Sequence, residues 1–405
     1  MTDDLCIILT LLLDVYLVWK QRKNPMVLLL AVFLLYVDYC IITGFYILDP
    51  VVNRDINYGK ETYELGLRVV TVYTFIRNAI MARLPYVKLP EKRENDLIYY
   101  LLLVFILYVL VTGVDRSILK SYSVRTSSLY EYAILPFTLM VFYSGNSKVK
   151  MVLNFTVAFI YIFQDFYYGG RSSSTHVIFV MALFYGFRFL NMRNILIAMF
   201  GLIIVMSFVG EYRTYYTLDG ILMGNIISQA SDTFFVSDTC AYSYHSSLAQ
   251  LYTSIYLDLD LRHLSFVAFF ISIFTGASYL TNFGLDPKLA VPAWSTLDYQ
   301  WNSGGEIMGP TFYFWLGWPG VVVLTFATFW FIWFMLKYQD KTALPSLCFI
   351  VIISMSTRWM LYNPMTLYRS AFFIFPILYL GCKMVENSKK RKGNKTNAQH
   401  MQTNK

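Results

Sequence analysis

Residues 26–48 read MVLLLAVFLLYVDYCIITGFYIL, and Asp38 is the single charged side chain in this apolar run of 23 residues. About 20 apolar residues are enough for an α-helix to cross the hydrocarbon core of a bilayer. An apolar run of this length is therefore typical of a transmembrane helix. The stretch predicts a membrane protein and directs attention to similar runs on either side of it.

Similar runs recur along most of the chain. They lie at residues 4–19, 63–82, 97–114, 128–144, 151–168, 175–190, 194–209, 310–336, 343–361 and 370–385. Together they predict an all-α, polytopic membrane helix bundle with about 11 transmembrane helices. We expect residues 1–385 to form one integral membrane domain and the basic tail 386–405 to be cytoplasmic and disordered.

The composition of the 405-residue chain agrees with this class of protein. Hydrophobic residues make up 57% of the chain and charged residues 14%, whereas soluble domains contain roughly 25% charged residues. The net charge of +8 comes from short loops and from the tail, where basic residues orient membrane proteins. Nucleic acid is therefore not expected as a partner.

Basic residues divide the connecting segments into two sets. The richer set contains Lys20, Arg22, Lys23, Arg77, Arg83, Lys88, Lys92, Arg93, Lys148, Lys150, Arg188, Arg193, Lys337, Lys341 and the tail. Cytoplasmic loops carry an excess of Lys and Arg, so this set predicts the cytoplasmic side. The N-terminus, residues 169–174 and residues 210–309 would then face outward.

The segment 210–309 interrupts the succession of apolar runs and predicts one large extracytoplasmic loop between late helices. Within it, residues 264–280 carry no charge and are nearly long enough to span a membrane. A single crossing there would move the basic tail to the outer side, against the charge rule. We therefore expect residues 264–280 to form an interfacial or re-entrant segment.

Arginines gather at the ends of the expected spans on the outer side. These residues are Arg171, Arg213, Arg358 and Arg369. A guanidinium group donates two parallel hydrogen bonds and stays charged, which suits it to phosphate. The alternative is that each arginine anchors a helix at the interface or pairs with a nearby acid such as Asp165.

Three titratable residues are candidates for acid–base chemistry on the same side. Glu306 ends a Gly-Gly-Glu turn just before the run 310–336, where burial would raise the pKa of its carboxyl; the alternative is a helix cap. His176 begins a span near Arg171, and His263 lies in the expected loop. No metal-binding spacing and no nucleotide-binding loop is present, so neither a metal nor another cofactor is expected.

Two acids, Asp14 and Asp38, lie inside expected spans. Ionisable groups within a membrane are costly and are consistent with a proton pathway. The runs offer no evident basic partner facing them, and we favour hydrogen bonding between helices.

Three short patterns resemble a known family, as does the overall layout. Arg-Ser-Ser-Ser (residues 171–174) opens a span, Tyr212-Arg213 precedes the large loop, and Gly305-Glu306 is followed by Leu-Gly-Trp-Pro-Gly (residues 316–320). This arrangement is similar to that of the bacterial O-antigen and capsule repeat-unit polymerases, called Wzy-type. The resemblance is mainly in architecture, because each pattern is short.

The resemblance implies a metal-independent glycosyltransferase in the bacterial cytoplasmic (inner) membrane. It would polymerise polyprenyl-pyrophosphate-linked oligosaccharides on the outer face, among membrane lipids and with a chain-length regulator and a flippase as partners. The arginines would bind pyrophosphate and Glu306 would act as the base, with His176 or His263 as second choices. An O-antigen ligase is the alternative enzyme, and a lipid-linked oligosaccharide transporter is the alternative from another class.

Overall fold

The computed structural model describes residues 3–47, 58–114, 128–168, 170–215, 224–227, 238–256, 260–297 and 304–388. These residues are almost entirely helical, and an isolated antiparallel bridge joins Glu94 and Ser144. The expected all-α class is therefore confirmed for the described part of the chain. The predicted tail 386–405 falls mostly outside it.

Most of the α-helices coincide with the predicted apolar runs. The α-helices include α1 (Asp3–Lys20), α2 (Pro25–Ile47), α3 (Lys60–Met81), α4 (Asp96–Thr112), α5 (Ser128–Tyr132), α6 (Ile134–Phe142), α7 (Lys148–Tyr167), α8 (Ser172–Tyr185), α9 (Met192–Tyr215), α11 (Asp238–Tyr256), α12 (Leu261–Thr275), α13 (Pro292–Ser295), α14 (Met308–Leu336), α15 (Leu344–Ser354) and α16 (Ser356–Leu361). Of these, α11, α12 and α13 lie in the segment 210–309. Four further elements are η1 (Phe187–Phe189), η2 (Ala277–Phe283), η3 (Pro287–Ala290) and the π-helix η4 (Leu367–Ile374), and an α-helix continues from η4 to Ser388.

Five helical segments are long and apolar enough to cross a membrane, or six when the bent pair α12 and η2 is counted as one span. They are Pro25–Gly44, Lys148–Tyr167, Met192–Tyr212, Met308–Leu336 and Leu367–Ser388. Other expected spans coincide with shorter apolar helices, such as α4 and α8, or with helices that carry more charge, such as α3. The figure of about 11 crossings stays a prediction.

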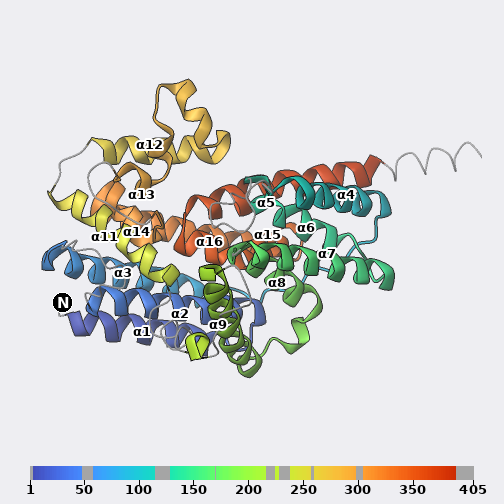
Figure 1. Ribbon diagram of the computed structural model, residues 1–405, viewed down its shortest axis with the longest axis horizontal. Helices are drawn as coiled ribbons and strands as arrows, with labels where there is room; N and C mark the ends of the chain where they lie inside the picture. Colours follow the sequence, from blue (N-terminus) through green and yellow to red (C-terminus); the bar gives the residue numbers. More distant parts are fainter. Residues whose placement is uncertain are drawn as a thin grey trace, which may run out of the picture.

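The helices form two groups along the longest axis of the molecule (Figure 1). Helices α1, α2 and α3 pack together at one end, where α14 lies against α3. At the other end α4 packs on α6 and α7 on α8, and the C-terminal helix that begins with η4 runs beside them. Helices α15 and α16 lie between the two groups.

The described part of residues 210–309 is largely helical, and α11 packs against α2, α3 and α14. A Cβ on Gly44 of α2 would lie 2.6 Å from the ring of Tyr244, so the absence of a side chain there lets α11 approach closely. The sequence pattern predicts a loop where α11 lies. Ser243, Ser246, Ser247 and Thr253 of this helix are buried, and Ser247 and Thr253 donate their hydroxyls to backbone carbonyls one turn earlier.

The segment predicted to be interfacial or re-entrant, residues 264–280, lies on α12 and η2. These two helices meet at an angle of 114° across Gly276, whose φ is 91°. That geometry belongs either to a broken span or to a re-entrant loop. The left-handed backbone at this position favours glycine, because a Cβ would be strained there.

Helix α14 is kinked where Gly317 adopts φ 63° and Pro319 follows. The kink interrupts the regular helical hydrogen bonds of the preceding turn. Arg262 of α12 compensates by donating from Nε to the Phe314 carbonyl at 2.5 Å and from Nη2 to the Tyr313 carbonyl at 3.4 Å. Helix α12 is thus tied to α14 by charge-assisted hydrogen bonds.

Candidate functional site

Glu306 lies in the turn before α14, and its side chain is fully buried. Its Oε2 accepts hydrogen bonds from Gln250 Nε2 at 3.2 Å and from the Ala293 amide at 3.3 Å, whereas Oε1 has no partner. Burial raises the pKa of the Glu306 carboxyl to about 8, although the two hydrogen bonds lower it. The carboxyl therefore keeps its proton to a higher pH than an exposed glutamate does, and its Oε1 is free to contact a further group.

The turn that carries Glu306 lies against α16. A Cβ on Gly305 would lie 2.7 Å from the Leu361 carbonyl and 2.9 Å from Ser243 Oγ. Ser243 of α11 also donates a hydrogen bond to the Leu361 carbonyl. Glycine at 305 is what allows the Glu306 turn to reach the end of α16, three residues beyond Arg358.

Arg358 of α16 forms an ion pair with Glu131 of α5, and its guanidinium lies 5.2 Å from the ring centre of Tyr362. Next to it in sequence, Thr357 Oγ1 is 3.1 Å from His176 Nε2. His176 is buried, and its Nδ1 has no partner. The structure thus brings Arg358 and His176 to one place, with the arginine already neutralised by a carboxylate.

Arg369 lies on η4, with its guanidinium 5.6 Å from the ring centre of Tyr132. Tyr132 follows Glu131 directly, so α5 contacts both Arg369 and Arg358. No carboxylate among the described residues forms an ion pair with Arg369. Arg358 and Arg369 therefore both contact α5, but only Arg358 forms an ion pair with a described carboxylate.

Arg171 precedes α8 and has a different environment. Its Nη1 donates to the Met206 carbonyl of α9 at 3.5 Å. No ion pair joins Arg171 to the nearby Asp165 in the described structure; Asp165 Oδ2 accepts the Ser174 amide at 2.7 Å and caps α8. Gly170 permits this cap, since a Cβ there would lie 2.2 Å from Asp165 Oδ1.

The remaining predicted site residues are not brought to this neighbourhood by a described contact. His263 is exposed on α12. Arg213 belongs to α9, but its side chain lies outside the described part of the structure. Among the described residues, no cluster of three or more His, Cys, Asp and Glu residues could hold a metal ion.

Sequence reasoning missed three residues that shape this region: Glu131, Gln250 and Ser243. Each lies on a helix distant in sequence from its partner, so no local pattern marks it. One signal was available for Gln250, because a long polar side chain within a helix that also carries buried apolar residues needs a hydrogen-bond partner.

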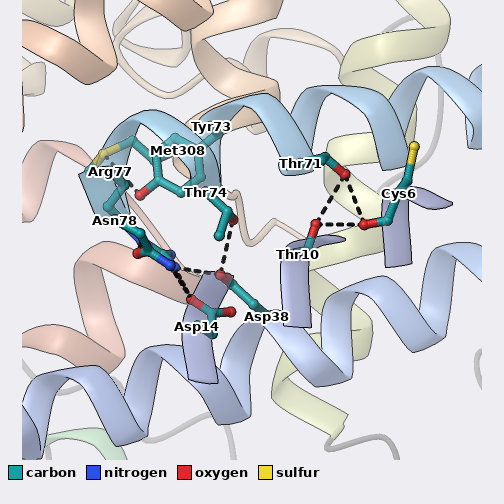
Figure 2. A network of polar contacts seen from close by, with 10 residues as sticks. All are labelled: Cys6, Thr10, Asp14, Asp38, Thr71, Tyr73, Thr74, Arg77, Asn78 and Met308. Atoms are coloured by element: carbon teal, nitrogen blue, oxygen red, sulfur yellow. Dashed lines mark hydrogen bonds and ion pairs between the residues drawn. The ribbon is translucent and has the colours of Figure 1, made fainter. Parts of the chain in front are cut away.

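A second polar centre lies among α1, α2 and α3 (Figure 2). Arg77 Nη2 is 2.6 Å from Asp14 Oδ1 and 2.7 Å from Asp38 Oδ2, and all three side chains are buried. Asn78 also donates to Asp14 at 2.8 Å, and Thr74 to Asp38 at 3.1 Å. The assignment of Arg77 to a cytoplasmic loop and the expectation that the two acids lack a basic partner are therefore wrong.

The reason for this correction is geometric. Arg77 lies near the end of an apolar run predicted to be cytoplasmic, where basic residues usually mark the membrane surface. The turn of α3 directs it inward, toward acids on two other helices (Figure 2). The favoured interpretation of helix–helix bonding for Asp14 and Asp38 agrees with these contacts.

The chain was compared with models of protein families, with curated proteins and with solved structures. None of them matches. Functional reasoning therefore starts from the residues and contacts described above.

Proposed function

We propose that this chain is a polytopic glycosyltransferase that polymerises polyprenyl-pyrophosphate-linked oligosaccharide repeat units into O-antigen or capsular polysaccharide. The reaction would take place on the outer face of the bacterial cytoplasmic membrane. Support comes from the resemblance in layout and motifs, and from the several apolar helices that are able to span a membrane.

The chemistry needs a base and a cationic site for the leaving group. A sugar hydroxyl of the incoming unit attacks the anomeric carbon of the growing chain, and the bond from that carbon to the pyrophosphate oxygen breaks. The hydroxyl proton passes to the base, and the polyprenyl pyrophosphate leaves with its charge stabilised by guanidinium groups. The bond broken supplies the driving force, so no nucleotide takes part.

The observation that carries the proposal is the buried Glu306 carboxyl, which is held by α11 and α13 in a turn whose Gly305 lies against the end of α16. Its Oε1 has no partner, and its turn packs against the helix that holds Arg358. A pKa of about 8 lies close to a working pH, which is favourable for general-base catalysis. Because Glu306 is fully buried, substrate access requires the segment from α11 to α13 to move away from it.

The arginines would act on the leaving group in different ways. Arg369 has no carboxylate partner in the described structure and is the first choice for pyrophosphate. Arg358 would exchange Glu131 for phosphate, while Arg171 and Arg213 would contact substrate from the ends of α8 and α9. His176 and His263 stay second choices for the base, and a chain-length regulator and a flippase stay proposed partners.

The test is complementation of a strain from which the gene has been deleted, with surface polysaccharide separated by length on a gel. Glu306→Gln preserves the shape of the side chain and removes the base, so long chains should fall by about a hundredfold or more. Protein abundance and the single-repeat product should stay at wild-type levels. Unchanged long chains would remove Glu306 from the role of base.

The same strain separates polymerase from ligase. Lipid-linked single repeats should accumulate if the chain is a polymerase. Accumulation of lipid-linked long chains would instead identify a ligase, and retention of single repeats on the inner face would identify a transporter.

A further inference from the structure

An open groove of about 510 Å³ lies between α4, the α5–α6 segment and the C-terminal helix. Its walls include Leu102 and Phe105 of α4, Pro136 of α6, and Leu378 beyond η4. The lining is apolar except for Tyr132 and Arg369. These helices lie side by side at one end of the molecule (Figure 1), and the groove volume is typical of sites for small ligands.

Arg369 supplies the single formal charge of the groove. It is half-buried, contacts the ring of Tyr132, and forms no ion pair with a described carboxylate. A cation in apolar surroundings is costly without a counter-ion. The groove therefore fits a ligand that combines an anion with an apolar chain.

The local backbone also marks Arg369. It lies within η4, a π-helix of 8 residues. Helices with this wider turn are rare and occur frequently at functional sites, because a regular α-helix is more stable. Two independent features, the unpaired guanidinium and the π-helix, thus coincide at one end of the groove.

We propose that this groove binds the isoprenoid chain of the polyprenyl-pyrophosphate substrate, with the pyrophosphate on Arg369. The inference rests on the proposed function and adds the place at which the lipid enters. A polyprenyl pyrophosphate has one chain behind its phosphates, whereas a phospholipid has two, and a single apolar groove with one guanidinium fits the lipid with one chain.

The dimensions agree with partial rather than complete enclosure of the chain. Leu378 follows Arg369 by nine residues, which corresponds to roughly 13 Å along a helix. This is less than half of the hydrocarbon core, which is about 30 Å thick. The first isoprene units would lie in the groove, and the rest of the chain would extend into the surrounding lipid.

The test uses the purified full-length protein in detergent and a polyprenyl pyrophosphate that carries a photoreactive group on its first isoprene units. Light should attach the probe to peptides from α4 and α6. Leu102→Trp fills the groove and Arg369→Gln removes its charge, and each should reduce labelling by about tenfold. Equal labelling of Leu102→Trp and wild type would overturn the proposal.

Two matched pairs control for folding. Leu101 and Ile377 are exposed neighbours of the groove residues Leu102 and Leu378 but do not line the groove. The probe should label Leu101→Trp and Ile377→Trp as strongly as the wild type, whereas labelling of Leu378→Trp should be reduced. If Leu102→Trp fails to fold, the second pair still decides the outcome.

Competition with unlabelled lipids identifies the occupant. Excess polyprenyl pyrophosphate should abolish labelling, while phosphatidylglycerol added in mixed detergent micelles should leave it nearly unchanged. Equal competition by phosphatidylglycerol would overturn the assignment to substrate in favour of a general phospholipid site.

The polysaccharide ladder separates failure of this inference from failure of the proposed function. If labelling follows the variants while the deletion strain still makes long chains, the groove is correct and the polymerase function is wrong. If the deletion strain loses long chains while Leu102→Trp labels normally, the function is correct and the groove is wrong.

Discussion

Asp14, Asp38 and Arg77 place two carboxylates and one guanidinium in a fully buried contact. One guanidinium balances one carboxylate, so the centre carries an excess acid. Asp14 Oδ2 and Arg77 Nη1 have no hydrogen-bond partner. One of the two aspartates is therefore sufficient to balance the charge of Arg77, and the other can be substituted by asparagine.

This charge balance predicts an uneven response to mutation. Arg77→Ala leaves both acids without a counter-ion and should destabilise the protein by about 3–5 kcal/mol. Asp38→Asn keeps the Asp14–Arg77 pair and should change stability by no more than about 1 kcal/mol. Thermal unfolding of the purified protein in detergent measures both effects.

The double variant Asp14→Asn/Asp38→Asn is the control for this interpretation. It leaves Arg77 buried without any acid, so it should be about as unstable as Arg77→Ala. A double variant as stable as the single Asp38→Asn variant would contradict the requirement for one carboxylate.

Glu306 predicts a dependence of stability on pH. Burial raises the pKa of its carboxyl from 4.5 to about 8, so the folded state binds more protons than the unfolded state between these values. The stabilising contribution is fully present below about pH 4.5 and is lost as the pH rises through about 8. If Glu306 acts as the base, the rate of polymerisation should rise with pH as its carboxyl loses a proton near pH 8.

Melting midpoints of wild type and Glu306→Gln across this range provide the measurement. The glutamine side chain does not titrate there, so the variant should become the more stable protein by a few kcal/mol at the alkaline end. Parallel curves for the two proteins would show that Glu306 has an ordinary pKa.

At the scale of elements, close helix contacts depend on particular glycines. Gly44 of α2 faces the ring of Tyr244 on α11, whereas Gly201 of α9 has open space at the corresponding position. Both lie within helices. Replacing each of these two glycines by alanine therefore distinguishes the need for space beside the Tyr244 ring from the ordinary preference of helices for alanine.

Gly44→Ala should force Tyr244 to shift and destabilise the protein by about 1–3 kcal/mol, because overpacking strains a filled interface. Gly201→Ala should leave the melting midpoint unchanged or raise it, since alanine favours a helix. If the Gly44→Ala variant has the same melting midpoint as the Gly201→Ala variant, α11 does not dock on α2 at Gly44.

At the scale of the whole molecule, the charge pattern predicts which ends of the helices face outward. Thr281 of η2 and Asp340 after α14 are both exposed in the structure. Thr281→Cys should react with a membrane-impermeant thiol reagent in intact cells. Asp340→Cys should react only after the membrane is opened, and the reverse pattern would invert the topology.

Much of the helical arrangement was predictable, because helix formation in lipid follows local apolarity. The runs at residues 26–48 and 151–168 contain α2 and α7 almost in full. The helices within residues 210–309 were harder to predict. The serines and threonines of α11 indicated a loop, although several of them are buried in a helix. Local composition reports the average environment of a segment, not the hydrogen bonds that its side chains find after packing.

The candidate site divides in the same way. The sequence alone determined that Glu306 precedes a long apolar helix and that Arg171, Arg213, Arg358 and Arg369 lie near the ends of apolar runs. Only the tertiary structure decided that Arg358 pairs with Glu131, that Arg369 remains without a carboxylate in the described residues, and that Arg77 turns inward. The apolar and charged residues of a segment predict whether it forms a membrane helix and where that helix ends. The partner of a buried charge depends instead on how helices distant in sequence are rotated and positioned against one another.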